Sequence, residues 1–289
     1  MPWGTSKVII PLSKKQAVRC CLSDFLRQHS TPTKTEVIPM KPFISLQMYT
    51  VREFANSDLP DTLRKIKKMG YDYIELAGTY GMEAAALRGL LDEVGLTAIS
   101  AHVPFDVLAN LQKTLADYKL LGCKYIVIPM LDKEKFAGGA EYTGEFLGFM
   151  REFCEACKAE GLVPAYHNHA FEFETLPDGT FKFDKFFADL PALNAEIDTG
   201  WVTAAGQSPE AYIQKYAGRC PIVHLKDTIL VADKYQDRPV GKGSQNIPKI
   251  VEVALAAGAV GFVAELDNAV GMTALEAAAE SREYLKSII

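Results

Sequence analysis

The sequence lacks any apolar run close to the roughly 20 residues that a membrane-spanning helix needs. Its first residues also lack a continuous apolar stretch long enough for the core of a signal peptide. The six cysteines lack the spacing of a disulfide framework, as expected for a reducing compartment. We therefore expect a cytoplasmic protein with no membrane partner.

An excess of positive charge is also absent. Lys and Arg number 31 against 36 Asp and Glu, giving a net charge of −5 and no broad basic field for a phosphate backbone. We expect no nucleic-acid partner. The chain has no glycine-rich nucleotide loop either, because Gly241-Lys242-Gly243 is too short and follows the wrong element.

What is present is an ordinary globular composition, with 48% hydrophobic and 23% charged residues among 289. Residues 1–39 differ from the rest, with six basic and only two acidic side chains. Apolar residues at 17, 18, 21, 22, 25 and 26 share one helical stripe. We expect an N-terminal extension over 1–39, as either a short amphipathic helix or a disordered tail, and a catalytic domain over 40–289.

From residue 43 onward, short β-rich runs alternate with longer segments of helical period, and most of these helical segments end on a glycine. Eight such units in about 250 residues predict a single-domain α/β fold, the (β/α)8 TIM barrel. The predicted strands cover 43–48, 73–76, 97–102, 125–129, 163–169, 195–198, 222–226 and 262–266. The predicted helices cover 59–69, 82–94, 107–121, 142–160, 183–190, 209–217, 248–257 and 274 to the C-terminus.

Polar residues gather where these strands end, which is the face that carries the active site in such barrels. Four of the five histidines are among them. The set comprises Glu75, His102, His167, His169, Asp198, His224, Lys226 and Glu265. Two or more carboxylates and two imidazoles around one point are a ligand set that suits Mn²⁺, Zn²⁺, Co²⁺ or Fe²⁺.

Strand alternation places His167 and His169 on one face of the fifth strand. One of them is expected to ligate metal. The other is expected to hydrogen-bond or protonate substrate, a role that suits the near-neutral pKa of an unperturbed histidine.

Six motifs follow the strand order and resemble the sugar phosphate isomerase/epimerase family of xylose isomerase-like TIM barrels. They are Tyr-Ile-Glu75-Leu-Ala-Gly, Ala-His102-Val-Pro, Tyr-His167-Asn-His169-Ala-Phe-Glu172-Phe, Asp198-Thr-Gly-Trp201, His224-Leu-Lys226-Asp and Ala-Glu265-Leu-Asp. The resemblance spans residues 43–289. It implies one divalent ion held by His167, Asp198, His224 and Glu265, with Mn²⁺ the first choice and Zn²⁺, Co²⁺, Fe²⁺ or Mg²⁺ as alternatives.

This sequence departs from the family at strand five, where a histidine replaces the glutamate that ketose 3-epimerases use as second acid/base. We predict Glu265 as the proton-transferring base, with His169 and Lys226 as further catalytic residues. The predicted substrate contacts are Glu75, His102, Trp201 and Glu172.

The predicted activity is a divalent-metal-dependent sugar isomerase or epimerase that moves a proton beside the carbonyl of a ketose, keto-sugar or inosose. A metal-dependent dehydratase or lyase acting on a keto-sugar, 3-keto-glycoside or inosose is the alternative, since inosose dehydratase-like relatives share the scaffold. The expected partner is a small, preferably unphosphorylated sugar. The sequence leaves the oligomeric state open, with a homo-oligomer as one alternative that the family resemblance suggests. A non-catalytic sugar-binding barrel and an apurinic endonuclease are the weaker alternatives. The endonuclease is disfavoured because strand four ends without His or acid and Trp201 stands where that family has a His.

Overall fold

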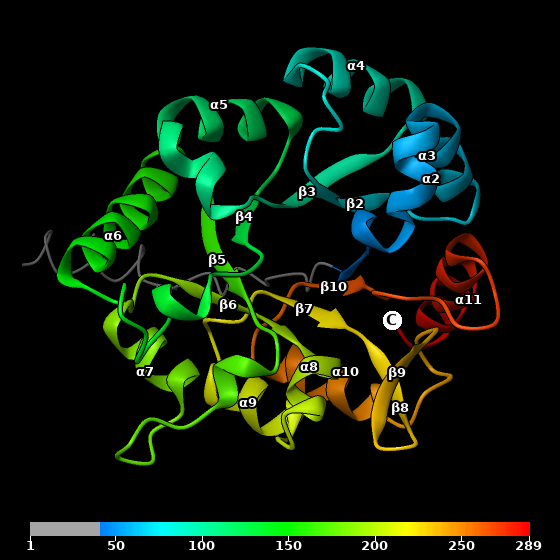
Figure 1. The fold of residues 1–289 in the computed structure, drawn as a ribbon. Coiled ribbons are helices and arrows are strands. Elements are labelled where there is room, and N and C mark those ends of the chain that lie inside the picture. The colour runs from blue at the N-terminus through cyan, green and yellow to red at the C-terminus, as the bar shows by residue number, and fades with distance from the viewer. Residues whose placement is uncertain (1–40) are drawn as a thin grey trace, which may run out of the picture. The chain divides into compact units, whose positions relative to one another are not determined.

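The computed structural model describes residues 41–289, so the extension predicted over 1–39 lies outside the described residues. Eight parallel strands close into a barrel in the order β1-β10-β7-β6-β5-β4-β3-β2 (Figure 1), which confirms the predicted fold. These strands are β1 Phe43–Gln47, β2 Tyr73–Ala77, β3 Thr97–His102, β4 Tyr125–Ile128, β5 Val163–His167, β6 Asn194–Asp198, β7 Ile222–Leu225 and β10 Gly261–Ala264.

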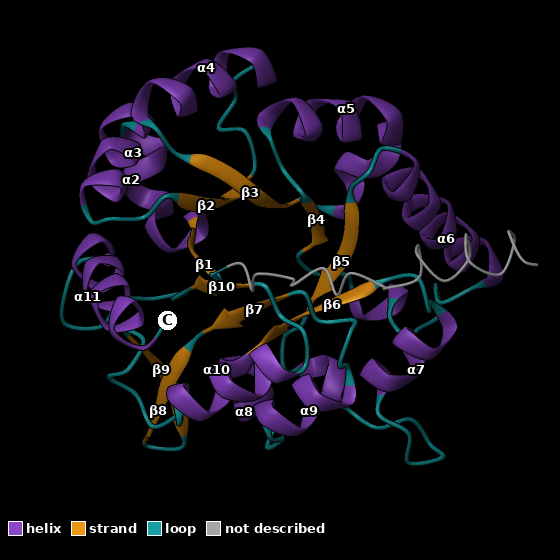
Figure 2. Ribbon diagram, turned by 180° about the vertical axis from the view of Figure 1, so that it is seen from behind, coloured by secondary structure: helices purple, strands orange, loops and turns teal. Residues whose placement is uncertain are grey.

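Helices surround the barrel, as both ribbon views show (Figure 2). Their buried faces pack on the outward-facing side chains of the strands and form the main hydrophobic core. The helices are α2 Arg52–Ser57, α3 Leu59–Lys68, α4 Ala84–Val94, α5 Leu111–Leu121, α6 Gly144–Ala159, α7 Lys182–Asp189, α8 Thr199–Ala204, α9 Pro209–Lys215, α10 Ile247–Ala256 and α11 Ala274–Ile288.

The ends of the helices follow local chemistry that is visible in the sequence. Gly95 and Gly122 end α4 and α5 with φ of 77° and 98°, a left-handed conformation that glycine adopts without steric cost. The Asp58 side chain caps α3, and Thr273 caps α11 in a reciprocal capping box with Glu276. The predicted helix boundaries therefore differ from the observed ones by only a few residues.

The barrel interior is divided by polarity. Tyr125, Val127, Ala165 and Ile222 form a small separate apolar cluster inside it. Toward the C-terminal ends of the strands the buried side chains become polar, with Glu75, His167, Glu196 and His224 all within the strands and at most 2% exposed. Because buried polar groups require partners, this arrangement builds a hydrogen-bonded site on an apolar support.

Five strands end one or two residues earlier than predicted, and three of them precede predicted site residues. β5 ends at His167, β7 at Leu225 and β10 at Ala264, so His169, Lys226 and Glu265 lie in the first residues after their strands. An antiparallel hairpin that was not predicted follows β7, with β8 Asp227–Val231 paired to β9 Lys234–Arg238. It turns tightly because both turn residues, Ala232 and Asp233, have positive φ.

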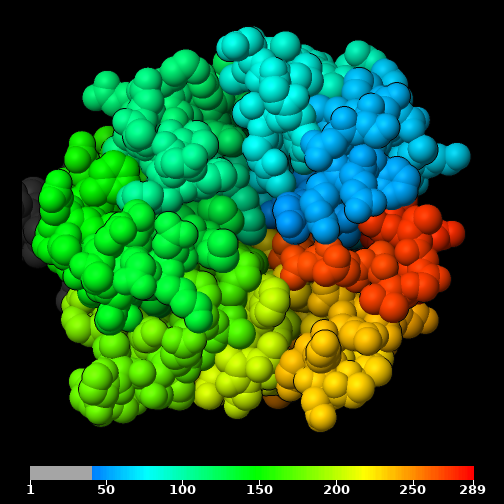
Figure 3. All heavy atoms as spheres, viewed as in Figure 1, coloured from blue at the N-terminus to red at the C-terminus, as the bar shows by residue number. Residues whose placement is uncertain are grey.

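Among the described residues, no helix has the length and apolar character needed to cross a bilayer. In the space-filling view, segments from the first and last units of the barrel, blue and orange-red, lie side by side on one face (Figure 3). The backbone pairing of β1 with β10 explains this contact, because it closes the barrel between the two ends of the described chain.

Candidate active site

The carboxyl ends of the strands surround a cavity of about 520 Å³. Its size falls within the range typical of small-molecule sites. The lining combines aromatic, imidazole and carboxylate groups from several βα segments. It comprises Tyr49, Arg52, His102, Pro129, Met130, His167, His169, Trp201, Glu265, Asp267 and Asn268.

The four predicted metal ligands, His167, Asp198, His224 and Glu265, are brought together beside this cavity and are called the outer cluster below. One donor atom from each lies within 4.8 Å of the other three, and all four side chains are buried. The barrel register accounts for part of this, because Asp198 pairs with His224 on neighbouring strands. His167, rather than His169, is the strand-five histidine in the outer cluster.

The outer cluster has the chemistry of a divalent cation site. Two imidazoles and two carboxylates form a mixed N/O donor set suited to Mn²⁺, Zn²⁺, Co²⁺ or Fe²⁺. Asp198 Oδ2 is buried and accepts no hydrogen bond from the described residues. Burial, opposed by Lys226 and reinforced by Glu265, raises the pKa of Asp198 to about 7. A divalent ion would stabilise both carboxylates in the charged form, so these residues fit such an ion.

A second, inner cluster, made of Glu75, Glu196 and His102, lies against the other side of the same histidines. Glu196 Oε2 is 2.8 Å from His102 Nε2, 3.1 Å from His224 Nε2 and 3.3 Å from His167 Nδ1. Glu75 Oε1 is 2.7 Å from His224 Nε2 and 3.0 Å from His102 Nε2. The Gln47 amide also donates to Glu75 Oε1 at 2.6 Å.

Glu196 was not among the predicted site residues. It stands two residues before Asp198 on β6, and strand alternation therefore places both side chains on the inner face of the barrel. The prediction considered only the polar residues at the end of each strand, and on β6 that residue is Asp198. The overlooked signal was a carboxylate two residues before the strand end, in register with His167.

His102 bridges the two inner carboxylates. Burial alone would lower its pKa, but the charges of Glu75 and Glu196 outweigh burial and raise the pKa to about 10. Burial likewise favours neutral Glu75, yet the charges of His102 and His224 hold the pKa of Glu75 well below its ordinary value. At neutral pH a positive His102 therefore offsets part of the negative charge inside the barrel.

Lys226 is 2% exposed and lies among three carboxylates. Its Nζ is 2.8 Å from Asp267 Oδ2, 3.3 Å from Asp198 Oδ2 and 3.3 Å from Glu265 Oε2. The ammonium also lies over the Trp201 ring, 5.0 Å from its centroid. Asp267, which was not predicted, is the closest partner of this lysine.

His169 occupies the edge of the site. Its side chain is 28% exposed and its ring centroid lies 5.3 Å from that of Trp201. Burial, aided by the positive charge of Lys226, lowers its pKa to about 4. The expectation of a near-neutral pKa at this position is therefore wrong, and His169 is neutral at pH 7.

Two predicted substrate contacts do not line the cavity. Glu75 and Glu172 are both fully buried. Glu172 accepts hydrogen bonds from the Tyr166 hydroxyl and the His169 backbone N–H, each at 2.9 Å. Glu172 thereby links the segment after β5 to Tyr166 on the strand. The other two predicted contacts, His102 and Trp201, do line the cavity.

The Gly241-Lys242-Gly243 loop already holds an anion of the chain itself. The Asp227 carboxylate accepts backbone hydrogen bonds from Gly241 at 3.0 Å, Gly243 at 2.8 Å and Gln245 at 3.2 Å. A Cβ at position 243 would lie 2.1 Å from Asp227 Oδ1, so only glycine fits there. The loop therefore has a structural role in this chain.

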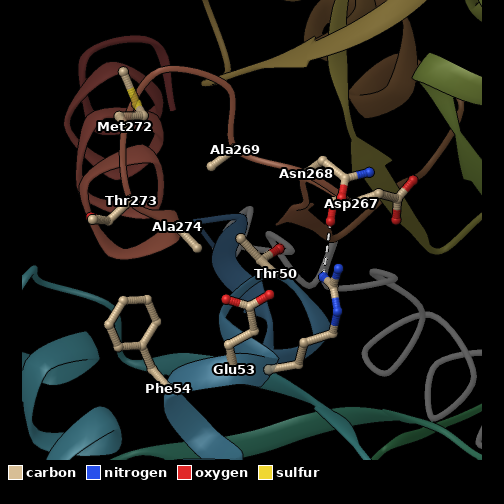
Figure 4. Close-up of a pocket in the computed structure, with 10 residues that line it drawn as sticks. Thr50, Glu53, Phe54, Asp267, Asn268, Ala269, Met272, Thr273 and Ala274 are labelled. Atoms are coloured by element: carbon tan, nitrogen blue, oxygen red, sulfur yellow. Dashed lines mark hydrogen bonds between the residues drawn. The ribbon is translucent and has the colours of Figure 1, made fainter.

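A smaller cavity of about 230 Å³ adjoins the main one and shares Arg52, Asp267 and Asn268 with it. Figure 4 shows Thr50, Glu53 and Phe54 on one side of it and the segment from Asp267 to Ala274 on the other. Arg52 Nη1 donates to the backbone oxygens of Tyr49 and Asp267, each at 2.9 Å. This arginine thereby ties the segment after β1 to the segment after β10.

Comparison with known families gives one match that covers most of the chain. The family described as xylose isomerase-like TIM barrel matches residues 63–288. Inosose dehydratase from Geobacillus kaustophilus (strain HTA426) is 22% identical over 208 residues, covering 60% of this chain and 66% of that protein. The match thus spans just under two thirds of that relative's length.

Solved structures give the same fold. A sugar phosphate isomerase/epimerase from Parabacteroides distasonis ATCC 8503 superposes with a TM-score of 0.71 and 25% identity, covering 85% of this chain and 98% of that one. The IolI protein with a bound zinc atom superposes with a TM-score of 0.65 and 17% identity, covering 85% and 97%.

Proposed function

Because the chain belongs to the xylose isomerase-like TIM barrel family, as its sequence motifs predicted, we propose that it is a divalent-metal-dependent enzyme that moves a proton beside the carbonyl of a sugar. The reaction we favour is isomerisation or epimerisation of a ketose, keto-sugar or inosose. The observation that carries the proposal is the convergence of His167, Asp198, His224 and Glu265 beside a cavity of suitable size. The IolI protein, which shares the fold, binds a zinc atom, and this supports the proposal of a metal in this chain.

A bound divalent cation supplies Lewis acidity that polarises a carbonyl oxygen and acidifies the adjacent C–H. Glu265 is the base in this proposal. Burial is outweighed by the charges of Lys226 and His224, which hold the pKa of Glu265 well below its ordinary value. Glu265 is therefore a carboxylate at neutral pH, able to accept a proton from a carbon of a substrate bound in the cavity.

Lys226 and Trp201 complete the proposed substrate site. The Lys226 ammonium, held by Asp267, would stabilise negative charge that develops on a substrate oxygen. The Trp201 indole lines the cavity, and its buried Nε1–H has no acceptor within residues 41–289. A sugar hydroxyl would satisfy this donor, while the ring would cover an apolar face of the sugar.

A second candidate is dehydration or another β-elimination on a keto-sugar, 3-keto-glycoside or inosose. The similarity to inosose dehydratase favours it. So does the neutral His169, which lines the same cavity as Glu265 and could hydrogen-bond a departing hydroxyl. Proton abstraction by Glu265 is common to both reactions, which differ in whether the proton returns to the sugar or a hydroxyl leaves it.

Elemental analysis of the purified protein, combined with NMR in D₂O, tests the proposal. Ketoses, 3-keto-glycosides and inososes are incubated with the enzyme. We expect about one Mn, Zn, Co or Fe per chain and deuterium at a carbon beside a carbonyl, and the product distinguishes isomerisation from elimination. Absence of both metal and exchange would refute the proposal.

A further inference from the structure

The histidines of the outer cluster each have a carboxylate on the ring nitrogen that faces away from it. His224 Nδ1 lies 2.8 Å from Glu265, whereas its Nε2 lies 2.7 Å from Glu75. His167 Nε2 lies 3.8 Å from Asp198, whereas its Nδ1 lies 3.3 Å from Glu196. His224 therefore faces the outer cluster with Nδ1, whereas His167 faces it with Nε2.

A neutral imidazole has one lone pair and one N–H, and a metal can take only the lone pair. With a cation in the outer cluster, the lone pairs must be on His224 Nδ1 and His167 Nε2. The N–H groups are then on His224 Nε2 and His167 Nδ1, which face Glu75 and Glu196. The inner carboxylates are therefore placed to accept these N–H groups and to fix the tautomer of each ligand.

We propose that Glu75 and Glu196 are positioning residues, an inference that rests on the metal site of the proposed function. The two glutamates fix the tautomers and ring orientations of His224 and His167 and do not bind the metal themselves. Gln47 holds Glu75 in place through its 2.6 Å hydrogen bond. The stack of His102 on His224, with centroids 5.2 Å apart and planes 6° apart, restrains the ring from the side. This proposal assigns a role to Glu196, a fully buried carboxylate.

A competing arrangement would place the ion among residues of the inner cluster instead of the outer cluster. His102, His167, Glu196 and His224 also bring donor atoms within 4.8 Å of one another. If the ion were held there, Glu196 would be a ligand, and Asp198 and Glu265 would not be. Removal of Glu196 would then have the effect that our proposal assigns to removal of Asp198.

The test compares Glu196→Gln, Glu75→Gln and Asp198→Asn with the wild type, using Co²⁺ alone as the probe. We expect the dissociation constant to rise about 10- to 100-fold in the two glutamate variants, with an unchanged Co²⁺ absorption spectrum, because the ligand set is retained. Asp198→Asn should change the spectrum. Ser100→Ala is the matched control, since Ser100 is equally buried in β3 and its hydroxyl has no partner in residues 41–289.

¹⁵N-histidine NMR of the Zn²⁺-loaded protein provides a second readout that is independent of turnover. We expect Nε2–H on His224 and Nδ1–H on His167 in the Zn²⁺-loaded wild type. In the metal-free protein we expect Nδ1–H on His167 in the wild type and mixed His167 tautomers in Glu196→Gln. Unchanged affinity and tautomers in both glutamate variants would overturn the proposal while leaving the metal site intact. So would loss of the Co²⁺ spectrum in Glu196→Gln but not in Asp198→Asn.

If the wild-type protein binds neither Co²⁺ nor Zn²⁺, the proposed function is refuted. The role of Glu196 is then tested separately, by the tautomer of His167 in the metal-free protein. Nδ1–H in the wild type and a mixture in Glu196→Gln would support it, and any other pattern would overturn it. Circular dichroism checks that each variant folds. Glu75→Gln tests the same idea on the other ring if Glu196→Gln does not fold.

Discussion

Glu265 combines three contacts that set its role at the scale of a single residue. It lines the cavity, lies 2.8 Å from His224 Nδ1 and lies 3.3 Å from Lys226 Nζ. Glu265→Gln keeps the shape of the side chain but removes its ability to accept a proton. We expect turnover to fall by at least about 100-fold, because general-base catalysis contributes about 10²- to 10⁴-fold.

The measurement for Glu265→Gln is steady-state turnover together with C–H exchange in D₂O, with thermal unfolding as the control for fold. The variant should unfold within a few degrees of the wild type. Retained exchange in a folded Glu265→Gln protein would exclude Glu265 as the base.

The burial of the Glu172 side chain makes the stability of the fold depend on pH. Burial outweighs its hydrogen bonds and raises its pKa from 4.5 to about 7. Its contribution to stability is therefore fully present below about pH 4.5 and is lost as the pH rises through about 7. A shift of this size corresponds to a change of roughly 3 kcal/mol in the free energy of unfolding.

Glu172→Gln should remove this dependence. We expect the unfolding free energy of the variant to vary less than that of the wild type between about pH 5 and about pH 8, as measured by urea denaturation at each pH. Parallel pH profiles for the two proteins would show that Glu172 does not titrate in this range.

At the scale of elements, the β8–β9 hairpin supports the site from outside the barrel. The Asp237 carboxylate on β9 accepts the backbone N–H groups of Asp267 at 2.8 Å and Asn268 at 3.1 Å. Asp267 in turn holds Lys226. The hairpin therefore fixes the segment after β10 that carries the partner of the buried lysine.

Asp237→Ala should release that segment. We expect faster hydrogen exchange at the amides of Asp267 and Asn268, with exchange in the barrel strands unchanged, because only local hydrogen bonds are lost. Lys234→Ala is the control on the same strand, since Lys234 is exposed. Equal exchange in Asp237→Ala and the wild type would contradict this coupling.

The sequence predicted the helices and strands of the barrel better than it predicted the residues of the site. Helices and strands followed from periodicity and glycine caps, because those signals are local. The hairpin was missed because Asp227 to Arg238 alternates weakly, with an exposed tip, and comes directly after a strand. Strand ends indicated the outer cluster. Glu196 could have been found from strand alternation, since it shares a face with Asp198. Asp267 could not, because its contact with Lys226 depends on the path of the chain after β10, which tertiary packing sets.

At the scale of the whole molecule, the barrel encloses several buried carboxyl groups. Glu75, Glu196, Asp198 and Glu265 are each at most 3% exposed. Their mutual repulsion is relieved in part by His102 and Lys226 and, in our proposal, by a divalent ion. In this proposal the ligand set exists only in the folded chain, so a bound ion would also stabilise the fold.

Metal removal tests this coupling. Dialysis against EDTA should lower the melting temperature, and readdition of Mn²⁺ or Zn²⁺ should restore it. The stabilisation is about 2.7 kcal/mol when the free ion is at roughly 100 times its dissociation constant. Asp198→Ala should lose the response to added ion. A melting temperature that is insensitive to EDTA and to added ion would count against a structural contribution of the metal.

The Asp227 carboxylate in the Gly241–Gln245 loop has a consequence for anion binding. Successive backbone N–H groups of this kind form an anion receptor, and here the receptor is filled by a residue of the same chain. A phosphoryl group could occupy this loop only by displacing the Asp227 carboxylate, which is held beside it by the chain. The backbone N–H groups of this loop are therefore already satisfied within the chain and are not open to the phosphoryl group of a ligand.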